Sequence, residues 1–262
     1  MDVLQFLKVR LARMTEPKPI GIAIGKLFGE RIPSRGLRIH SRDLTPQVKS
    51  QLLFRTYESA EIRAVCRHLR SDLDVIELGA SIGVLSCHIR RKLAINRHLY
   101  AIEPDLNLMK SIEKNLRANG LYSGVTILNR AISKVSGEQN FVRRKSNLNG
   151  HTAQLCQRGT MTVEGVTLSS LIGQLGIGKY ALVCDIEGAE AELIAGDFEA
   201  FNKCEQIVIE LHQRDHSDSE QLIEQLKNRH GFTLQAQYGK VYVLARPAPE
   251  NQQYVRAGLQ SA

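Results

Sequence analysis

Four carboxylates stand at or just beyond the ends of apolar runs in this chain. Glu77 lies near the end of "DVIEL", and Glu103 ends the next run, "LYAIE". Asp185 and Glu187 follow a third run, "YALVC". In an open α/β sheet, ligands lie beyond the carboxyl ends of the strands. The four acids therefore predict a binding site at that edge, for a ligand with hydroxyl groups or positive charge.

A turn of small residues follows Glu77. Its members are Gly79, Ala80, Ser81 and Gly83. Their size would let a ligand lie against the backbone at the start of a helix, but the pattern is not the GxGxxG of dinucleotide sites. The neighbouring carboxylate would also repel a phosphate. Glu103 is placed to accept hydrogen bonds from ribose hydroxyls. A ribose-bearing ligand with a positive centre and no phosphate is predicted, which describes S-adenosylmethionine.

The second acidic group lies in "CDIEGAE", which begins at Cys184. Asp185 and Glu187 would point to one side if the strand continued, because side chains two residues apart share a face of a strand. Such a pair could hold the cationic end of the cofactor, bind magnesium, or act as a general base. No third metal ligand is evident, so these roles stay open.

If a hydroxyl group accepted the methyl group of such a ligand, a base would assist the transfer, because an alcohol is a poor nucleophile. The candidate catalytic residues are Asp185, Glu187 and His212, which follows the run "QIVIEL". An unperturbed imidazole, with a pKa of about 6.5, would be mostly neutral at pH 7 and able to accept a proton. The alternative for His212 is a structural hydrogen bond. His151 lies in the irregular region 134–160, which could close over an acceptor, and Glu210 is expected to be internal.

From residue 56 onward, strand-like and helix-like stretches alternate. This order predicts an α/β domain over residues 56–246, with a doubly wound, mostly parallel sheet covered on both faces. The stretch "FTLQAQYGKVYVLA" reads as two strands with a turn at Gly239, a terminal hairpin that places one edge strand antiparallel to the rest. The tail, residues 247–262, has little apolar content and is expected to be flexible.

The first 55 residues form a basic extension. They contain 11 Lys and Arg against 4 Asp and Glu, whereas the remaining residues contain 24 against 23. A basic region of this kind can contact anionic lipid, nucleic acid or an acidic substrate. It can also be a solvated arm whose charges face water, and the sequence does not decide between these.

Cysteine usage and hydropathy bear on the compartment. The five cysteines are scattered and form no CxxC pair, which favours a reduced, cytoplasmic protein. No apolar run reaches 18 residues, so no transmembrane segment is predicted.

The chain resembles the FkbM-type family of class I S-adenosylmethionine-dependent methyltransferases, which have Rossmann-like folds. The matching pieces, in family order, are "YESAE" (57–61), "DVIELGASIG" (74–83), "IEPDLNLMKSIEKNLRANG" (102–120), "NRAIS" (129–133), "VTLSSLIGQLG" (166–176), "DIEGAEAELIAG" (185–196) and "IVIELH" (207–212). The resemblance implies a seven-stranded sheet with an antiparallel last strand. It also implies cofactor contacts from Glu77, the small-residue turn, Glu103 and Asp185, with adenine near Asn129 and Ala131.

Two positions depart from the family pattern. Glu77 stands where the family commonly has Asp, which keeps the charge. Val183 stands where the family often has Lys, two residues before the Asp of D-x-E-G. A mechanism that uses that lysine is therefore unavailable from this position, and either another group preserves the activity or the acceptor differs.

The resemblance implies O-methylation of a hydroxyl on a sugar, a glycolipid or a small metabolite. A first alternative is an RNA-directed methyltransferase or nucleic-acid-binding protein that uses the basic extension. The absence of tryptophan and the 5% aromatic content leave few platforms for base stacking, which makes nucleic acid the weaker partner. A second alternative is a methyltransferase fold without catalysis. A third, a nicotinamide oxidoreductase, conflicts with the missing GxGxxG.

Overall fold

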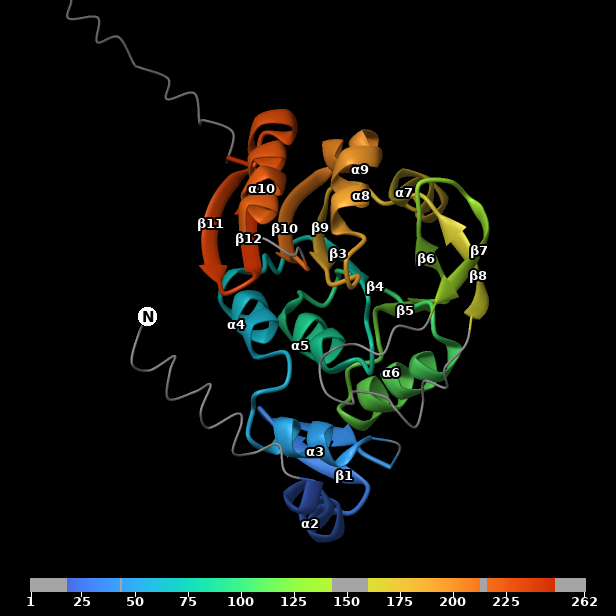
Figure 1. Ribbon diagram of the computed structural model, residues 1–262, viewed down its shortest axis with the longest axis vertical. Helices are drawn as coiled ribbons and strands as arrows, with labels where there is room; N and C mark the ends of the chain where they lie inside the picture. Colours follow the sequence, from blue (N-terminus) through green and yellow to red (C-terminus); the bar gives the residue numbers. More distant parts are fainter. Residues whose placement is uncertain (1–17, 43, 143–159, 213–215, 248–262) are drawn as a thin grey trace, which may run out of the picture.

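The computed structural model describes residues 18–42, 44–142, 160–212 and 216–247 (Figure 1). Its central layer is a seven-stranded sheet in the order β11-β12-β10-β9-β3-β4-β5. The strands are β3 (Asp74–Leu78), β4 (Leu99–Ile102), β5 (Val125–Leu128), β9 (Tyr180–Cys184), β10 (Cys204–Glu210), β11 (Thr233–Tyr238) and β12 (Val241–Ala245). The doubly wound α/β architecture predicted from the alternating pattern is confirmed.

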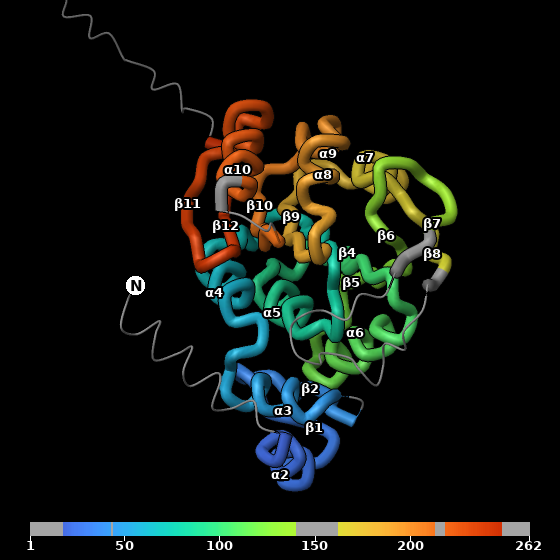
Figure 2. The backbone as a smooth tube through the Cα atoms, viewed as in Figure 1, coloured from blue at the N-terminus to red at the C-terminus, as the bar shows by residue number. Residues whose placement is uncertain are grey.

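Helices cover both faces of this sheet (Figures 1 and 2). One face carries α4 (Ser59–His68), α5 (Val84–Lys92) and α6 (Leu106–Ala118), and the other carries α7 (Leu168–Leu175), α8 (Glu190–Gly196), α9 (Phe198–Asn202) and α10 (His216–His230). Alternate residues of each strand enter the two cores: Val183 packs with the first group of helices, and Leu182 and Cys184 pack with the second. Strands buried on both faces explain the nearly continuous apolar runs in the sequence.

The terminal hairpin and the antiparallel last strand are confirmed, but the antiparallel strand is not the edge strand, as the prediction had it. β12 pairs antiparallel with both β10 and β11, so it lies inside the sheet, and the edge strand β11 runs parallel to β10. The cause is the composition of the hairpin. The apolar "VYVLA" of β12 is almost wholly buried and takes the inner position, whereas the polar "TLQAQY" of β11 is largely exposed and takes the edge.

The described part of the basic extension is folded and belongs to the core. It forms α2 (Lys18–Phe28), β1 (Arg31–Ser34), β2 (Leu37–His40) and α3 (Pro46–Leu53). Ile32 and Ile39 are fully buried in the same cluster as residues of α5 and α6. The side chain of Asn115 in α6 accepts a hydrogen bond from the backbone N–H of His40, at 2.7 Å. A solvated arm therefore does not describe residues 18–42 and 44–55.

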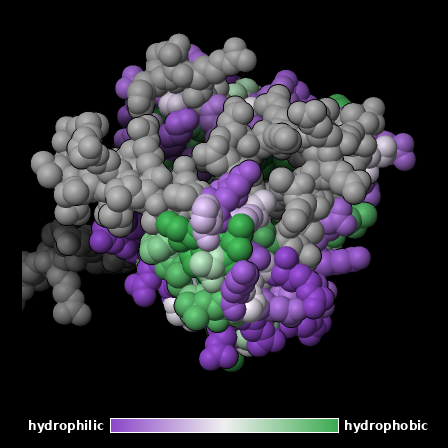
Figure 3. Space-filling view, turned by 60° about the horizontal axis from the view of Figure 1, so that its bottom comes forward, coloured by the Kyte–Doolittle hydropathy of each residue, from purple (hydrophilic) through white to green (hydrophobic). Residues whose placement is uncertain are grey.

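One face of this N-terminal unit exposes apolar and basic side chains together. Figure 3 shows apolar side chains gathered where the bottom of the molecule comes forward. Ile22 and Leu27 of α2 are 51% and 77% exposed. Lys18 and Lys26 are exposed on the same helix. None of the helices in the described residues combines the length and apolar character that crossing a membrane requires.

A smaller sheet lies beyond the β5 edge. It contains β6 (Ala131–Ile132), β7 (Gly137–Val142) and β8 (Thr160–Val166), in the order β6-β8-β7. The strand expected at 139–142 is confirmed as part of β7. Residues 143–159 of the irregular region, with His151, lie outside the described residues, as does the tail from residue 248.

Candidate active site

The turn between β3 and α5 uses its backbone N–H groups internally. Gly79 and Ala80 both donate to the carbonyl oxygen of Ile102, at 3.0 and 3.2 Å. The N–H of Ser81 donates to Oε2 of Glu103, at 2.8 Å. Phosphate-binding loops instead leave such N–H groups free to point at an anion. The N–H groups of Gly79, Ala80 and Ser81 are therefore already used within the protein and do not point at a bound anion.

Two positions of the turn require glycine because backbone atoms of other segments lie too close for a side chain. Gly79 has a φ of +84°, and a Cβ there would lie 1.8 Å from the carbonyl oxygen of Asp185. Gly83 has a φ of +79°, and a Cβ there would lie 2.8 Å from the Cα of Ile112 in α6. Close approach of a ligand was the reason expected from the sequence. Packing of the loop after β9 and of α6 is already sufficient to require glycine at both positions.

Glu77 lies behind this turn. It is 1% exposed, and its Oε2 accepts a hydrogen bond from the Ser86 hydroxyl of α5, at 2.6 Å. Burial raises the pKa of Glu77 to about 8, although the Ser86 hydrogen bond opposes the rise. Its Oε1 has no hydrogen-bond partner. Val183 is the register partner of Glu77 on β9, so the lysine common in the family would lie beside this buried carboxyl.

Glu103 and Asn129 come together beside the turn. Besides Ser81, Glu103 accepts a hydrogen bond from the N–H of Asp105, at 2.9 Å. The Asn129 amide donates to the backbone oxygens of Glu103 and Pro104, at 3.0 and 2.7 Å. Burial raises the pKa of Glu103 to about 7, against the effect of its two backbone hydrogen bonds.

Ala131 is buried in β6, the short strand that follows Asn129 by two residues. The residues expected to contact ribose and adenine therefore come from adjoining chain segments at one edge of the sheet. Among them, Ser81, Glu103 and Asn129 are joined by hydrogen bonds through Glu103.

The second acidic group does not extend β9. The strand ends at Cys184, and Glu187 has a left-handed φ of +55°, so the premise that a continued strand aligns the two acids is wrong. The two carboxylates converge nevertheless. Oδ1 of Asp185 and Oε2 of Glu187 lie 3.7 and 3.8 Å from Nε2 of His212. The structure thus brings the three predicted catalytic residues together.

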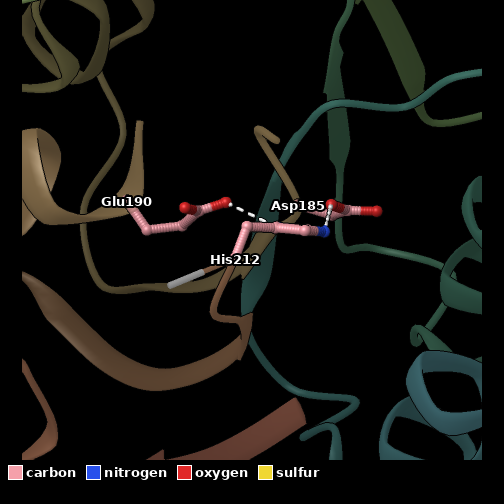
Figure 4. A group of neighbouring side chains, drawn as sticks. All are labelled: Asp185, Glu190 and His212. Carbon is pink, nitrogen blue, oxygen red and sulfur yellow. Dashed lines mark hydrogen bonds and ion pairs between the residues drawn. The ribbon is translucent and has the colours of Figure 1, made fainter. Parts of the chain in front are cut away.

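Glu190 contacts Nδ1, the other ring nitrogen of His212. This residue was not identified from the sequence. It is fully buried, and its Oε1 lies 3.1 Å from Nδ1 of His212 and accepts the N–H of Gly188 at 3.1 Å. Figure 4 shows the imidazole between the carboxylates of Glu190 and Asp185. With Nδ1 hydrogen-bonded to Glu190, Nε2 is the ring atom directed toward Asp185.

The charges around His212 change its expected protonation. Burial lowers its pKa, but the Glu190 hydrogen bond and the charges of Asp185, Glu190 and Glu187 outweigh burial and raise it overall. The unperturbed pKa assumed from the sequence therefore does not hold for His212, whose protonated form is favoured by the surrounding carboxylates. Asp185 has its pKa raised to about 7 by burial, an effect that His212 opposes.

Further carboxyl groups surround this site. Glu210 lies at the end of β10, with its Oε2 3.8 Å from Nε2 of His212. Burial and a hydrogen bond with Glu61 raise the pKa of Glu210 to about 10. Glu58 and Glu61 lie at the start of α4, within the family-like piece "YESAE". That match to the family pattern could have identified them as site residues. Within the described parts of the chain, these carboxylates form no ion pair with a lysine or arginine.

The geometry bears on whether these residues could bind a metal ion. One ligand atom each from Asp185, Glu190 and His212 lie within 4.8 Å of one another, which makes them a candidate metal group. The imidazole, however, lies between the two carboxylates and meets each with a different nitrogen (Figure 4). An ion held by Nε2 would thus have Asp185, Glu187 and Glu210 as neighbouring carboxylates, while Glu190 stays on the Nδ1 side of the ring.

Comparisons with known proteins agree with this architecture. The family described as "Methyltransferase FkbM domain" matches residues 77–234, more than half of the chain. The hexuronic acid methyltransferase AglP of Haloferax volcanii is 26% identical over 189 residues, which cover 66% of this chain and 76% of that protein.

Similar solved structures include the ribosomal protein L11 methylase from Lactobacillus delbrueckii subsp. bulgaricus, with 13% identity and a TM-score of 0.44 over 72% of this chain and 78% of that one. Another is NSun6 from Pyrococcus horikoshii with SFG, with 12% identity and a TM-score of 0.46 over 71% of this chain and 51% of that one. The family match covers β3 through the start of β11, including the turn and the His212 group. The chain therefore belongs to the FkbM methyltransferase family.

Proposed function

We propose that this chain transfers a methyl group from S-adenosylmethionine to a hydroxyl group of a sugar, a glycolipid or a small metabolite. The observation that carries the proposal is the site's composition. Carboxylates gather at the carboxyl ends of β3, β4, β9 and β10 and at the starts of α4 and α8, and among the described residues none of them pairs with a lysine or arginine. Three N–H groups of the turn are used internally and are not offered to a phosphate. The hexuronic acid acceptor in the name of AglP supports a sugar as the acceptor class.

The residues present fit the proposed cofactor by their chemistry. Glu103 and Asn129 would hold the nucleoside end, with Ala131 and the turn residues forming its surroundings. Buried carboxylate oxygens without hydrogen-bond partners, including Oδ1 of Asp185, suit a ligand that brings positive charge. When bound, the cofactor supplies a methyl group on a positively charged sulfur. Glu77, buried behind the turn with a pKa raised to about 8, would carry its charge at neutral pH only where a cationic ligand lowers that pKa.

The acceptor would be served by His212 and the acids around it. Glu190 fixes the imidazole through Nδ1 and leaves Nε2 to take the hydroxyl proton, the role of a general base. Because Asp185 and Glu187 stabilise the protonated ring, the proton can stay on His212 after transfer. Holding the hydroxyl in line with the methyl group would contribute through effective molarity.

Labelled-methyl transfer to sugar nucleotides, glycolipids and small hydroxylated metabolites tests this proposal, with and without magnesium. The expected result is transfer to a hydroxyl of at least one glycan, with loss of transfer in His212→Ala. Binding of S-adenosylmethionine without transfer to any hydroxyl acceptor would instead support the non-catalytic alternative.

The exposed basic face of the N-terminal unit favours contact with an anionic surface. Lys18, Lys26 and Arg31 are exposed and form no ion pair with another described residue. An RNA-directed methyltransferase would use the same face. Salt-dependent RNA binding, lost on charge reversal of these three residues, would support that second candidate.

A further inference from the structure

Glu58 occupies the N-cap position of α4 without acting as a cap. Its side chain makes no capping hydrogen bond to the helix N–H groups. Glutamate is also not among the residues preferred at this position, which are Ser, Thr, Asp and Asn. The capping role that would explain an acid here is therefore absent.

The backbone of Glu58 is in a strained conformation. Its φ of +42° and ψ of +40° lie in the left-handed region, which a residue with a Cβ adopts only at a cost in energy. Strain of this kind persists where the surrounding structure enforces it, and it concentrates at ligand sites. Glycine would adopt this backbone more easily, so the side chain must be kept for another reason.

Glu58 is linked to both parts of the site, to the turn through its neighbour Tyr57 and to the Asp185 group through charge. Its neighbour Tyr57 has its hydroxyl 3.5 Å from the Ser81 hydroxyl in the turn, and it also hydrogen-bonds Glu58. Burial first, then the charges of Glu61, Asp185 and Glu77, raise the pKa of Glu58 well above its usual range. Glu58 therefore lies close enough to interact with the acids of both the turn and the Asp185 group.

A polar atom of Glu58 lacks an internal partner. Its Oε2 is buried and makes no hydrogen bond. No lysine or arginine within the described ranges forms an ion pair with it. A buried carboxylate without a cation is costly, whereas a ligand with a positive charge would stabilise its ionised form.

We propose that Glu58 is a cofactor-binding residue that faces the sulfonium of S-adenosylmethionine and, with Asp185, distinguishes it from the uncharged product S-adenosylhomocysteine. This inference rests on the proposed function. The sulfonium must lie between the ribose, held near Glu103, and the acceptor hydroxyl, held near His212. Glu58 lies close enough to interact with acids of both parts of the site. Once the methyl group has left, the sulfur is neutral and the carboxylate no longer favours the ligand, which assists product release.

Titration calorimetry of the full chain with each of the two ligands tests this role. Glu58→Gln removes the charge and keeps the shape of the side chain. We expect S-adenosylmethionine to bind about tenfold more weakly and S-adenosylhomocysteine to bind within about twofold of wild type, because a hydrogen bond or ion pair to a charged group typically contributes this much. Glu192→Gln, an exposed acid on α8 that pairs with Lys134, is the matched control and should leave both affinities unchanged.

Glu58→Gly separates the role of the charge from that of the fold. Glycine relieves the left-handed strain, so this variant should melt no lower than Glu58→Gln while it also loses the preference for the charged ligand. If Glu58→Gln and Glu58→Gly weaken the binding of both ligands equally, or of neither, Glu58 does not distinguish the ligands by charge. The inference is then overturned. If wild type binds neither ligand, the proposed function itself is overturned, and the inference with it.

Discussion

Nδ1 of His212 lies 3.1 Å from Oε1 of Glu190, a carboxylate that is fully buried at the start of α8. Glu190 also accepts the N–H of Gly188, so its position is fixed from its own loop. The pair joins the end of β10 to the start of α8 across the edge of the sheet. It sets which imidazole nitrogen faces the other acids, and hence which nitrogen can take a proton.

Glu190→Gln should reduce turnover and shift its pH dependence. The hydrogen bond from His212 would lose its charged acceptor, and we expect kcat to fall by about 10²-fold, the lower range for loss of general-base assistance. Glu190 raises the pKa of His212, so removing its charge lowers that pKa. Since the base must be unprotonated, the acid limb of the rate profile should move to lower pH. Rates measured from pH 5 to 9 would show it.

The matched control is Glu192→Gln, two residues along α8 and exposed. It should leave both kcat and the position of the acid limb unchanged. A Glu190→Gln enzyme whose acid limb stays in place, or moves to higher pH, would show that Glu190 does not govern His212.

The sequence placed the acids of the strand ends correctly because parallel strands bring their carboxyl ends to one edge. Glu77, Glu103 and Asp185 needed only the strand assignment. Glu190 and Glu58 could not be found that way. Each lies at a helix start, and its contact depends on how α8 and α4 pack against β10 and the loop after β9. The left-handed backbone at Glu58 and Glu187 likewise has no signal in residue type.

The order of the last two strands, with β12 inside the sheet and β11 at the edge, was not predicted for a related reason. A hairpin in the sequence does not specify which of its strands pairs with the existing sheet. The more apolar β12 gains burial on both faces by taking the inner position next to β10. Comparing the apolar content of the two strands would have predicted the order correctly.

Gly79→Ala should destabilise the fold. The added Cβ would lie 1.8 Å from the carbonyl oxygen of Asp185, and the left-handed φ adds a further cost. Together these should lower the free energy of unfolding by about 2 kcal/mol or more. Urea unfolding would measure the change. Gly173→Ala is the control, since a Cβ there meets nothing within 4 Å. An unfolding free energy for Gly79→Ala equal to wild type would contradict the close approach.

Glu77→Gln should stabilise the ligand-free protein at pH 8 but not at pH 4. The folded state raises the pKa of Glu77 to about 8, above its unfolded value, through burial. Such a group binds more protons folded than unfolded, so its contribution to stability is complete below about pH 4 and is lost as the pH rises toward 8. Glutamine carries no charge and avoids this loss. The gain at pH 8 should exceed about 1 kcal/mol, since one pKa unit corresponds to about 1.4 kcal/mol.

Thermal melts of both proteins at pH 4, 6 and 8 would measure this difference. The gap between variant and wild type should widen steadily with pH. A constant gap would mean that Glu77 ionises normally in the folded protein.

Chelation should leave methyl transfer intact. Nδ1 of His212 is engaged by Glu190, and its hydrogen bond would have to break for Nδ1 to bind an ion. Nε2, which faces Asp185, Glu187 and Glu210, is the nitrogen that takes the proton in the proposed mechanism, so it is not left to hold an ion. Transfer rates measured with about 5 mM EDTA should equal the rates measured with magnesium to within about twofold. Positioning of the acceptor and base assistance need no metal here. Loss of activity on chelation, restored by magnesium alone, would show that the three residues rearrange to bind an ion.

Glu103→Ala should weaken S-adenosylmethionine binding without abolishing the fold. The carboxylate accepts the N–H groups of Ser81 and Asp105 and is the predicted acceptor for the ribose hydroxyls. A hydrogen bond to a charged group typically contributes about 1.5–3 kcal/mol, so the affinity should fall by about 10- to 100-fold. Both S-adenosylmethionine and S-adenosylhomocysteine carry the ribose, and both should lose affinity to the same extent. That shared loss contrasts with the selective loss expected for Glu58→Gln. If Glu103→Ala is folded by circular dichroism and binds both ligands as tightly as wild type, the nucleoside does not bind at Glu103.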